Sequence, residues 1–289
     1  MTARLIDGKE IAAALREDIK REVAEFQEEC GKAPGLSIIM VGDDPASALY
    51  VANKKRHCLA VGIRSEVHCF PKDVVFEEVA AKIRDLNSRA DIHGILIQLP
   101  VPNHLNSRDL LELVSPKKDV DGLHSQNVSA LHTGEPLIIP CTPLGVRHML
   151  LTVVESLAGL HVTVVGRSHI VGRPLAALLL QENCTVTHVH SRSEDWEDLA
   201  VRSDVIVMAA GVPDLLLESA VKAGAIVIDV GSTRVMNEED VAIFVGDVDV
   251  KSVYPKAGYV SPVPGGVGPM TVAYLLKNTL DAAKNQEKK

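Results

Sequence analysis

The stretch that decides the fold is His161-Val-Thr-Val-Val-Gly166-Arg-Ser168-His-Ile-Val-Gly172-Arg-Pro174. Apolar and β-branched residues lead into Gly166, and an Ala/Leu-rich segment follows Gly172, which predicts a strand, a glycine-bounded turn and a helix. A turn that opens a helix favours phosphate, because the helix N-terminus presents free N–H groups. The turn departs from the G-x-G-x-x-G pattern, since Ser168 stands where the second glycine would lie. We therefore expect the first strand–turn–helix unit of a dinucleotide-binding sheet.

Further apolar runs with strand character follow this unit. In NAD-binding proteins an acidic residue near the end of the second strand accepts the ribose 2′-hydroxyl. Here that position reads His190-Ser191-Arg192-Ser193, whose hydroxyls and guanidinium suit a 2′-phosphate and favour NADP. The same residues would also suit a solvated polar loop, since Glu194-Asp195 follow directly. The expected strands are 185–190, 204–209 and 225–230, with a shorter run at 244–247.

The first half of the chain alternates strand and helix signals, which is typical of a parallel sheet with crossover helices. Asp7 and Glu10 form a capping box at the start of one helix. Asp44 and Pro45 mark the start of another helix, which Gly62 should end. The predicted strands are 36–41, 63–70 and 92–98, and the predicted helices are 11–26, 45–62, 74–87 and 107–114.

Four polar side chains in this half are candidates for a ligand site. Tyr50 and Lys54 are four residues apart on a predicted helix, where an aromatic plate beside an ammonium group could hold a flat ligand and move a proton. Gln98 closes an apolar strand, and open parallel sheets bind ligands at the carboxyl ends of their strands. Asp121 lies beside Gly122 in a loop. Each has a plainer alternative: a surface tyrosine on a lysine stem, an amide that caps a strand, and ordinary turn chemistry.

The composition limits the class of protein. A chain of 289 residues, 46% of them hydrophobic, can bury one large core or two medium ones, and we expect two. The formal charge of −8 argues against nucleic acid as the main partner, because phosphate binding favours a basic surface. No apolar run reaches membrane-spanning length and no leader with a cleavage site opens the chain, so we expect a cytoplasmic protein with no membrane partner. The five cysteines form no CxxC pair, which fits reduced thiols better than disulfides or a zinc site, and we expect no metal.

The last part of the chain combines a fixed-shape loop with a final helix. The loop runs from Pro262 to Thr271 and holds three glycines and three prolines, so it offers a rigid surface against which a ligand can lie. A helix follows over about 271–283, and we expect it to return to the first half of the chain. Another helix, 142–157, should have Thr142 as N-cap and should bridge two domains.

Six segments stand out when they are taken together. They are Gly42-x-x-Pro45-Ala-Ser47 with Tyr50-Val-x-x-Lys54; Gly94-Ile-Leu-Ile-Gln98-Leu-Pro100; Lys118-Asp-Val-Asp121-Gly122; Pro140-Cys-Thr-Pro143-x-Gly145; Gly166-Arg-Ser168-x-x-Val-Gly172-x-Pro174; and Pro264-Gly-Gly-Val-Gly-Pro-Met-Thr271. Their order is that of the bifunctional methylenetetrahydrofolate dehydrogenase/cyclohydrolase family. The chain resembles this family over nearly its whole length.

The resemblance implies two α/β domains flanking a cleft, with the C-terminal helix returning to the first domain. Residues 1–142, completed by 271–289, would form the folate-binding catalytic domain, and residues 143–270 a Rossmann-like NADP-binding domain. The implied reaction is NADP-dependent oxidation of 5,10-methylene-tetrahydrofolate to 5,10-methenyl-tetrahydrofolate, followed by hydrolysis to 10-formyl-tetrahydrofolate. This chemistry belongs to one-carbon metabolism and purine biosynthesis. The resemblance also implies a homodimer.

The resemblance further assigns roles to residues. Tyr50 would stack on the aromatic part of the folate, Lys54 would be the catalytic lysine with Gln98 as its partner, and Asp121 would bind the pterin. A pterin edge presents an amino group and a ring N–H side by side, and a carboxylate can accept both. The residues implied for NADP are Gly166, Arg167, Ser168, Gly172, Ser191, Arg192 and Ser232, and further folate contacts are Pro264, Gly265 and Gly266.

Two other classes of function fit part of the sequence. A two-domain NAD(P) dehydrogenase of the shikimate dehydrogenase kind would show similar periodicity, but it gives no reason for Tyr50, Lys54, Gln98 and Asp121 to occur together. A catalytically silent binding or scaffold protein is the other alternative, and the intact Lys54 and Gln98 speak against it. Folate binding tests the first alternative, and a spectrophotometric assay tests the second.

Overall fold

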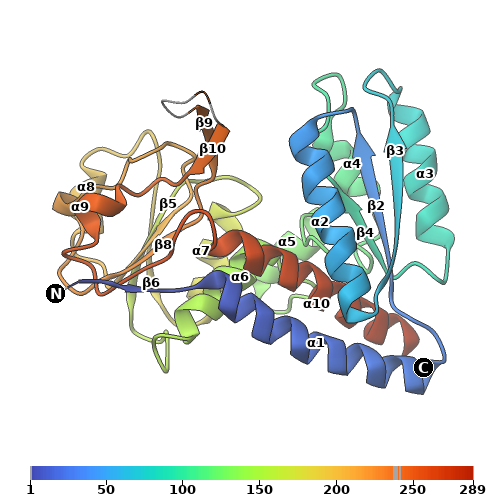
Figure 1. Cartoon of the computed structure of the whole chain (residues 1–289), viewed down its shortest axis with the longest axis horizontal. Coiled ribbons are helices and arrows are strands. Elements are labelled where there is room, and N and C mark those ends of the chain that lie inside the picture. Colours follow the sequence, from blue (N-terminus) through green and yellow to red (C-terminus); the bar gives the residue numbers. More distant parts are fainter. Residues whose placement is uncertain (1, 237–239, 241, 289) are drawn as a thin grey trace. The chain divides into compact units, whose positions relative to one another are not determined.

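The computed structural model describes residues 2–236, 240 and 242–288, and the chain forms two compact units (Figure 1). The six-stranded unit contains residues 1–12 and 142–271, and the three-stranded unit contains 13–141 and 272–289. The sequence predicts the first twelve residues in the same domain as 13–141. They belong instead to the six-stranded unit, because β1 (Arg4–Leu5) pairs with β11 (Tyr259–Val260).

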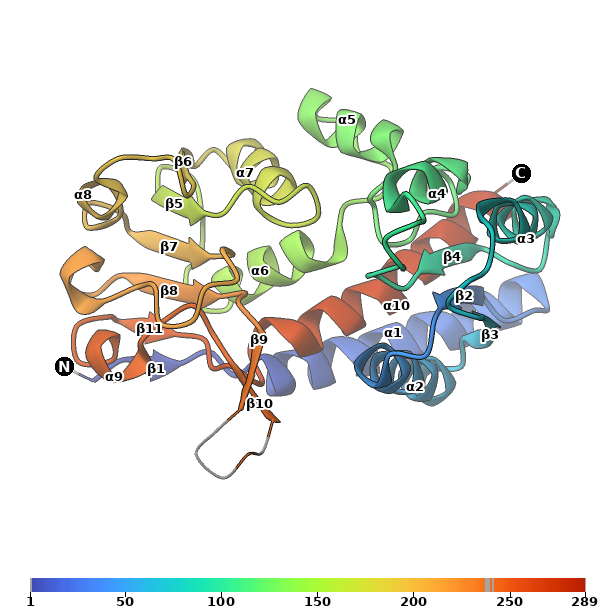
Figure 2. The ribbon, with the colours of Figure 1, turned by 90° about the horizontal axis from the view of Figure 1, so that it is seen from above.

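The six-stranded unit is built on a parallel sheet with the strand order β1-β11-β8-β7-β5-β6 (Figure 2). This confirms the predicted Rossmann-like parallel sheet. The chain passes from β5 out to β6 and then continues on the other side of β5 with β7, so the strand order reverses at β5. In open parallel sheets such a reversal leaves a ligand crevice at the carboxyl ends of the strands. The remaining strands are β5 (His161–Val165), β6 (Thr185–Val189), β7 (Val205–Met208) and β8 (Ile226–Asp229).

Short helices and a separate hairpin complete this unit. The run expected at 244–247 overlaps β10 (Ala242–Val245) only at residues 244 and 245. β10 pairs antiparallel with β9 (Thr233–Met236) outside the main sheet. Sequence analysis did not identify β9 or the hairpin. The helices that follow β5, β6 and β10 are α7 (Gly172–Gln181), α8 (Trp196–Ala200) and α9 (Val250–Val253), and a 3₁₀ turn lies at Glu218–Ala220.

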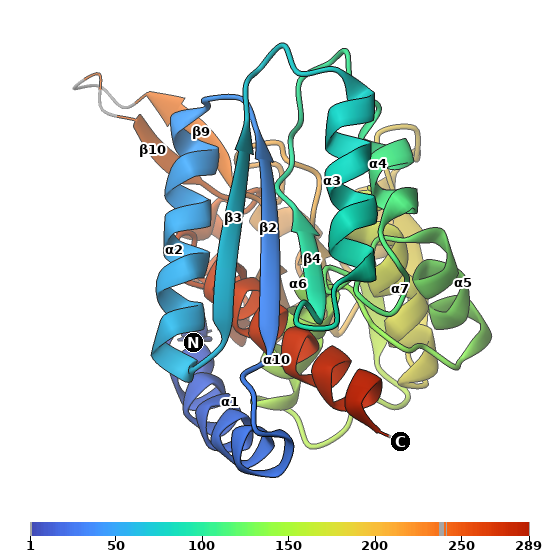
Figure 3. The same ribbon diagram turned by 90° about the vertical axis from the view of Figure 1, so that its right-hand side faces the viewer.

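The three-stranded unit has a parallel sheet in the order β3-β2-β4 (Figure 3). Alternate residues of β2 pack on opposite faces: Leu36 and Ile38 belong to one hydrophobic cluster, and Ile39 and Val41 to another. Both faces are therefore covered, as expected for a parallel sheet. The strands are β2 (Gly35–Val41), β3 (Arg64–Phe70) and β4 (Gly94–Ile97). The helices next to these strands in the chain are α2 (Pro45–Val61), α3 (Phe76–Ser88), α4 (Ser107–Leu113) and α5 (Ser125–Thr133).

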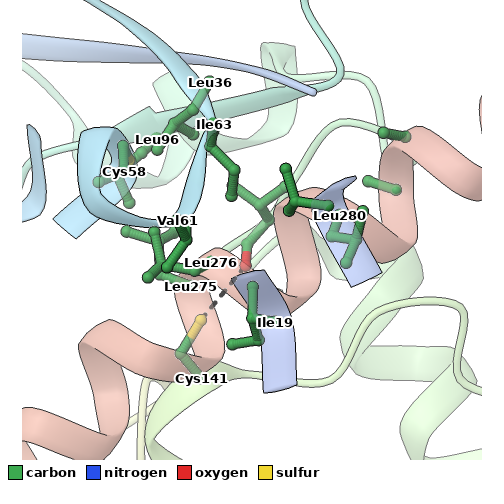
Figure 4. Packing of buried hydrophobic residues seen from close by; sticks show 14 of the residues in the cluster. Ile19, Leu36, Cys58, Val61, Ile63, Leu96, Cys141, Leu275, Leu276 and Leu280 are labelled. Atoms are coloured by element: carbon green, nitrogen blue, oxygen red, sulfur yellow. Dashed lines mark hydrogen bonds between the residues drawn. The ribbon is translucent and has the colours of Figure 1, made fainter. Parts of the chain in front are cut away.

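One face of this sheet packs against three helices that come from distant parts of the chain. Ile19 of α1 (Gly8–Cys30), Val61 of α2 (Pro45–Val61) and Leu276 of α10 (Val267–Glu287) meet in a single cluster with strand residues such as Leu36 (Figure 4). The predicted return of the C-terminal helix to the first half of the chain is confirmed. Burial of each large aliphatic side chain in such a cluster is worth roughly 1.5–3 kcal/mol.

The ends of α2 follow the sequence rules closely. The Asp44 side chain accepts the Ser47 N–H at 2.8 Å, Pro45 occupies the first turn, and Gly62 ends the helix with φ of 86°. A positive φ of this size favours glycine, because other residues meet a steric penalty there. The helix that carries Tyr50 and Lys54 is therefore fixed at both ends by local signals.

The helix α6 (Cys141–Leu151) differs from its prediction at both ends. It begins at Cys141, so Thr142 lies inside the first turn and is not the N-cap. It ends six residues earlier than the expected residue 157, because Thr152 N–H and Val153 N–H bond to the Met149 and Leu150 carbonyls in a tight turn. The boundary between the two units falls between residues 141 and 142, at the start of this helix.

Candidate active site

Lys54 and Gln98 come together in the three-stranded unit. Lys54 lies on α2, and its Nζ donates a hydrogen bond of 2.9 Å to Oε1 of Gln98. Gln98 follows the last residue of β4, and its Nε2 donates to the Leu99 carbonyl at 2.7 Å, which fixes the orientation of the amide. A lysine ammonium has three N–H donors, so one acceptor leaves two of them for another partner.

Among the charged groups around Lys54, Asp121 has the largest effect on its pKa. Burial lowers the pKa of Lys54, and the charge of Asp121 opposes that shift. Burial likewise raises the pKa of Asp121, and the charge of Lys54 opposes it. Removal from water therefore shifts the pKa of each group in the direction that favours its neutral form.

Tyr50 lies one helical turn before Lys54 on the same helix. It is 45% exposed, so its ring is available to a ligand. An exposed aromatic ring one turn away from a half-buried amine can stack on a flat ligand while the amine exchanges a proton with that ligand. The structure thus places Tyr50, Lys54, Gln98 and Asp121 in one unit and brings Lys54 and Gln98 into direct contact.

The two aspartates of Lys118-Asp-Val-Asp121 have different environments. Lys118 Nζ donates to the carbonyls of Leu86, Asn87 and Arg89, so it closes the C-terminal end of α3. Asp119 is buried, and its Oδ2 accepts the His124 N–H and the Asn127 amide, each at 2.8 Å. Lys118 and Asp119 therefore hold the loop from which Asp121 projects.

The six-stranded unit has a cavity of about 520 Å³ at the carboxyl ends of β5, β6 and β7. This is the crevice expected where the strand order reverses. The turn after β5 supplies Gly166, Arg167 and Ser168, and the loop after β6 supplies Ser191. The remaining lining residues are Val165, His190, Ser193, Trp196, Ala209, Ala210, Val212 and Leu215.

The backbone of the turn after β5 fits a dinucleotide. Gly166 has φ of 113°, and a Cβ there would lie 2.0 Å from the Ala209 carbonyl oxygen. A Cβ on Gly172 would lie 1.9 Å from the Gly166 carbonyl oxygen. Both glycines are therefore required for the close approach of strand, turn and helix. Ser168 Oγ accepts the N–H groups of Val171 and Gly172 at 3.2 and 3.3 Å, so this residue organises the start of α7.

The loop predicted to select the cofactor forms a compact turn. His190 Nδ1 accepts the Arg192 N–H at 3.1 Å, and Ser193 Oγ accepts the His190 N–H at 3.0 Å. Ser191 lines the cavity, whereas the Arg192 side chain is exposed. Of the two residues predicted to contact the 2′-phosphate of NADP, Ser191 therefore lies in the cavity wall and Arg192 is exposed to solvent.

Comparison with known proteins identifies the family. Residues 6–121 match the catalytic domain of tetrahydrofolate dehydrogenase/cyclohydrolase, and residues 140–287 match its NAD(P)-binding domain. The chain belongs to this family. It is 48% identical to the bifunctional protein FolD of Bradyrhizobium sp. (strain ORS 278), over 98% of this chain and 96% of the relative. It is 46% identical to the bifunctional protein FolD 1 of Acinetobacter baylyi, over 98% and 95%.

Solved structures give the same result. The methylenetetrahydrofolate dehydrogenase-cyclohydrolase of Trypanosoma brucei, complexed with NADP and an inhibitor, aligns over 100% of both chains with a TM-score of 0.95 and 39% identity. The FolD enzyme of Campylobacter jejuni aligns over 98% of this chain and 99% of its own, with a TM-score of 0.93 and 41% identity. Shikimate dehydrogenase from Aquifex aeolicus has a TM-score of 0.51 at 12% identity, so it shares the fold alone. The predicted family, with NADP as its cofactor, is confirmed.

The other predicted cofactor and folate residues lie in the six-stranded unit. Ser232 is exposed and follows Gly231, beyond the end of β8. Gly265 has φ of 111° and lies beside the Lys9 side chain. A Cβ on Gly266 would lie 2.6 Å from the Pro262 carbonyl oxygen, so the loop that contains Pro264 folds tightly on itself.

Sequence analysis missed two residues that support Asp121. Asn278 of α10 is buried, and its Nδ2 donates to the carbonyls of Val120 and Ile139, each at 2.9 Å. Cys141 is buried too, and its Sγ donates to the Val120 carbonyl at 3.3 Å. A polar residue between Leu275, Leu276 and Leu280 on the apolar side of the last helix was a signal that could have indicated Asn278.

No metal site and no membrane span were found in the part of the chain that the structure describes. Among residues 2–236, 240 and 242–288, no three His, Cys, Asp or Glu side chains gather so as to hold a metal ion. In the same ranges no helix is long and apolar enough to cross a bilayer.

Proposed function

We propose that Lys54, Gln98, Tyr50 and Asp121 form the catalytic group of a bifunctional enzyme of one-carbon metabolism. The enzyme oxidises 5,10-methylene-tetrahydrofolate to the methenyl form with NADP and hydrolyses that product to 10-formyl-tetrahydrofolate. The observation that carries the proposal is the 2.9 Å hydrogen bond between Lys54 Nζ and Gln98 Oε1, in the electrostatic field of Asp121. It places a lysine of lowered pKa where its protonation state can be controlled.

The oxidation requires orientation more than acid–base help. The carbon that loses hydride lies between two nitrogens, whose lone pairs stabilise the resulting cation. NADP⁺, when bound, accepts the hydride. Gly166, Arg167, Ser168 and Gly172 would hold its phosphates at the start of α7, where backbone N–H groups and the helix dipole favour negative charge. Ser191 and Arg192 would contact the 2′-phosphate from the loop after β6, and Ser232 would lie toward the nicotinamide.

The hydrolysis requires proton transfer. Water must lose a proton as it adds to the methenyl carbon, and a ring nitrogen must gain one as the ring opens. The neutral amine of Lys54 can accept the first proton and the resulting ammonium can return it. Burial already favours that neutral amine, and a cationic folate nearby would favour it further by like-charge repulsion.

The remaining residues would hold the folate. Asp121 would accept the amino group and ring N–H of the pterin, and Tyr50 would stack on the aromatic part of the substrate. Pro264, Gly265 and Gly266 supply a loop of fixed shape that we assign to further folate contacts.

We also propose a cytoplasmic homodimer that supplies formyl groups to purine biosynthesis. Support for the dimer comes from the family resemblance and from the β9–β10 hairpin, where Met236, Ile243 and Phe244 are exposed. Apolar side chains that gather on one hairpin are typical of an interaction surface. Sedimentation of the purified protein, with and without Phe244→Glu, tests this part of the proposal.

One spectrophotometric experiment tests the enzymatic function. The purified chain is mixed with methylene-tetrahydrofolate and NADP⁺, and the absorbance of the methenyl product is followed as it forms and disappears. The same measurement is repeated with NAD⁺. Formation of the methenyl product without its enzymatic decay would overturn the cyclohydrolase assignment, and no formation with either cofactor would overturn the dehydrogenase assignment.

A further inference from the structure

Two buried aspartates lie behind the dinucleotide cavity, outside the group of residues discussed so far. Asp229 is the last residue of β8, and Asp247 lies two residues beyond β10. Their exposed fractions are 1% and 0%. Buried carboxylates persist where backbone or side-chain donors satisfy them, so the partners of this pair show what it holds.

The two carboxylates collect backbone N–H groups from three separate segments. Asp247 Oδ2 accepts the N–H groups of Ala210 and Gly211, at 2.7 and 2.9 Å. Asp229 Oδ1 accepts those of Gly231 and Asp247, at 2.8 and 3.0 Å, and Asp229 Oδ2 accepts that of Val248 at 3.0 Å. The loop after β7, the loop after β8 and the segment after β10 are thereby joined.

Two glycines pack reciprocally against these carboxylates. A Cβ on Gly231 would lie 2.2 Å from Asp247 Oδ1, and a Cβ on Gly246 would lie 1.9 Å from Asp229 Oδ2. Gly231 thus lets the loop after β8 approach Asp247, and Gly246 lets the segment after β10 approach Asp229. Neither position has room for a side chain. We name Asp229, Gly231, Gly246 and Asp247 the aspartate cluster.

The aspartate cluster fixes one wall of the dinucleotide cavity. Ala209, Ala210 and Val212 line that cavity, and Ala210 and Gly211 are the residues whose N–H groups Asp247 holds. Asp247 itself is fully buried and lines no part of the cavity. Its influence on a bound dinucleotide therefore passes through the backbone of the loop after β7.

We propose that Asp247 is a positioning residue for hydride transfer, an inference that rests on the proposed function. Its carboxylate keeps the loop after β7 in the shape that binds NADP. Asp229 links Asp247 to the segment after β8, because its Oδ1 accepts the N–H groups of both Gly231 and Asp247. Hydrolysis of the methenyl product uses Lys54 in the other unit and needs no dinucleotide. Loss of Asp247 should therefore affect the two activities unequally.

The test compares Asp247→Ala with Asp249→Ala. Asp249 is a matched control, because its Oδ1 also accepts two backbone N–H groups, those of Lys251 and Ser252, but at the start of α9. We expect Asp247→Ala to lower the dehydrogenase kcat/KM for NADP⁺ by about tenfold or more, the scale of two lost buried hydrogen bonds. Cofactor-free hydrolysis of methenyl-tetrahydrofolate should stay within about twofold of wild type, as should both activities of Asp249→Ala.

Equal loss of both activities in Asp247→Ala, or an unchanged kcat/KM for NADP⁺, would overturn the inference. A wild-type enzyme without NADP-dependent oxidation would overturn the proposed function, and the inference with it. If Asp247→Ala fails to fold, amide hydrogen exchange of the unliganded wild-type protein gives a separate test. We expect slow exchange at Ala210 and Gly211 before any cofactor is added, and fast exchange at both would show that Asp247 does not hold the loop in advance.

Discussion

We predict that replacement of Lys54 by methionine separates the two activities. Methionine is similar in length and unbranched, but it cannot exchange protons. The substitution removes the 2.9 Å hydrogen bond to Gln98 Oε1 and the positive charge that opposes the raised pKa of Asp121. Because general acid–base catalysis contributes about 10²–10⁴-fold, cyclohydrolase kcat should fall by that factor, or about 3–5 kcal/mol of barrier.

The dehydrogenase should lose much less. Asp121 without Lys54 becomes more easily protonated, which weakens its acceptance of the pterin N–H groups and raises the folate KM. Hydride transfer itself needs no proton from the protein, so its kcat should stay measurable, within about tenfold of wild type. Folding should not suffer, because burial already disfavours the charge of Lys54.

The assay follows methenyl-tetrahydrofolate, which should accumulate in Lys54→Met and decay only at the uncatalysed rate. Lys55→Met is the control, because Lys55 is the next residue of α2 and its side chain is exposed. It should behave like the wild type in both activities. Equal loss of dehydrogenase and cyclohydrolase activity in Lys54→Met, with folate and NADP binding intact, would refute the assignment of Lys54 as the proton-transfer group.

Three further predictions concern folate binding, the choice of cofactor and the response to acid. Asp121→Asn should weaken folate binding strongly and leave NADP binding nearly unchanged by calorimetry, and equal loss of both would indicate a structural role for the loop. Wild type should prefer NADP⁺ over NAD⁺, and Ser191→Ala or Arg192→Ala should raise the KM for NADP⁺ by about 10–100-fold, since a charge-assisted contact is worth roughly 1.5–3 kcal/mol, with little effect on NAD⁺. Burial lowers the pKa of His93, whose Nδ1 accepts the Gly35 N–H at 2.9 Å. As the pH falls below 6.5, His93 is therefore protonated in the unfolded chain before it is protonated in the folded one. The free energy of unfolding of the wild type should then fall by up to about 1.4 kcal/mol per pH unit. Denaturant titrations of His93→Gln should lack this component.

The features that the sequence predicted well depend on neighbours in the chain or on the rules of parallel sheets. The limits of α2 follow from Asp44, Pro45 and Gly62, all within one turn of its ends. Gln98 could be placed at a ligand site because it lies at the carboxyl end of a strand, where such sheets collect functional groups. Its contact with Lys54 was implied by the family resemblance, and the structure shows it. The six family segments then supplied the chemistry that periodicity alone could not.

The features that the sequence did not reveal depend on residues far apart in the chain. Asn278 supports the loop of Asp121 from a helix more than a hundred residues later, and Asp247 holds Ala210 and Gly211 from beyond a hairpin. An isolated asparagine in an apolar helix, or an aspartate beside a glycine, has many local explanations. Their roles became visible only when the backbone groups that they bind were known.

The pairing of β1 with β11 has a consequence for the order in which the chain can fold during synthesis. Arg4 leaves the ribosome about 250 residues before its partner Tyr259. At about 5–20 residues per second, the first strand waits roughly 13–50 seconds for its neighbour. Late in that interval, once residues 161–229 have emerged, β5, β6, β7 and β8 can assemble, whereas β1 still lacks its neighbour β11. Nascent chains stalled before residue 259 should therefore be cut readily by protease near Arg4, and chains released beyond β11 should resist that cleavage.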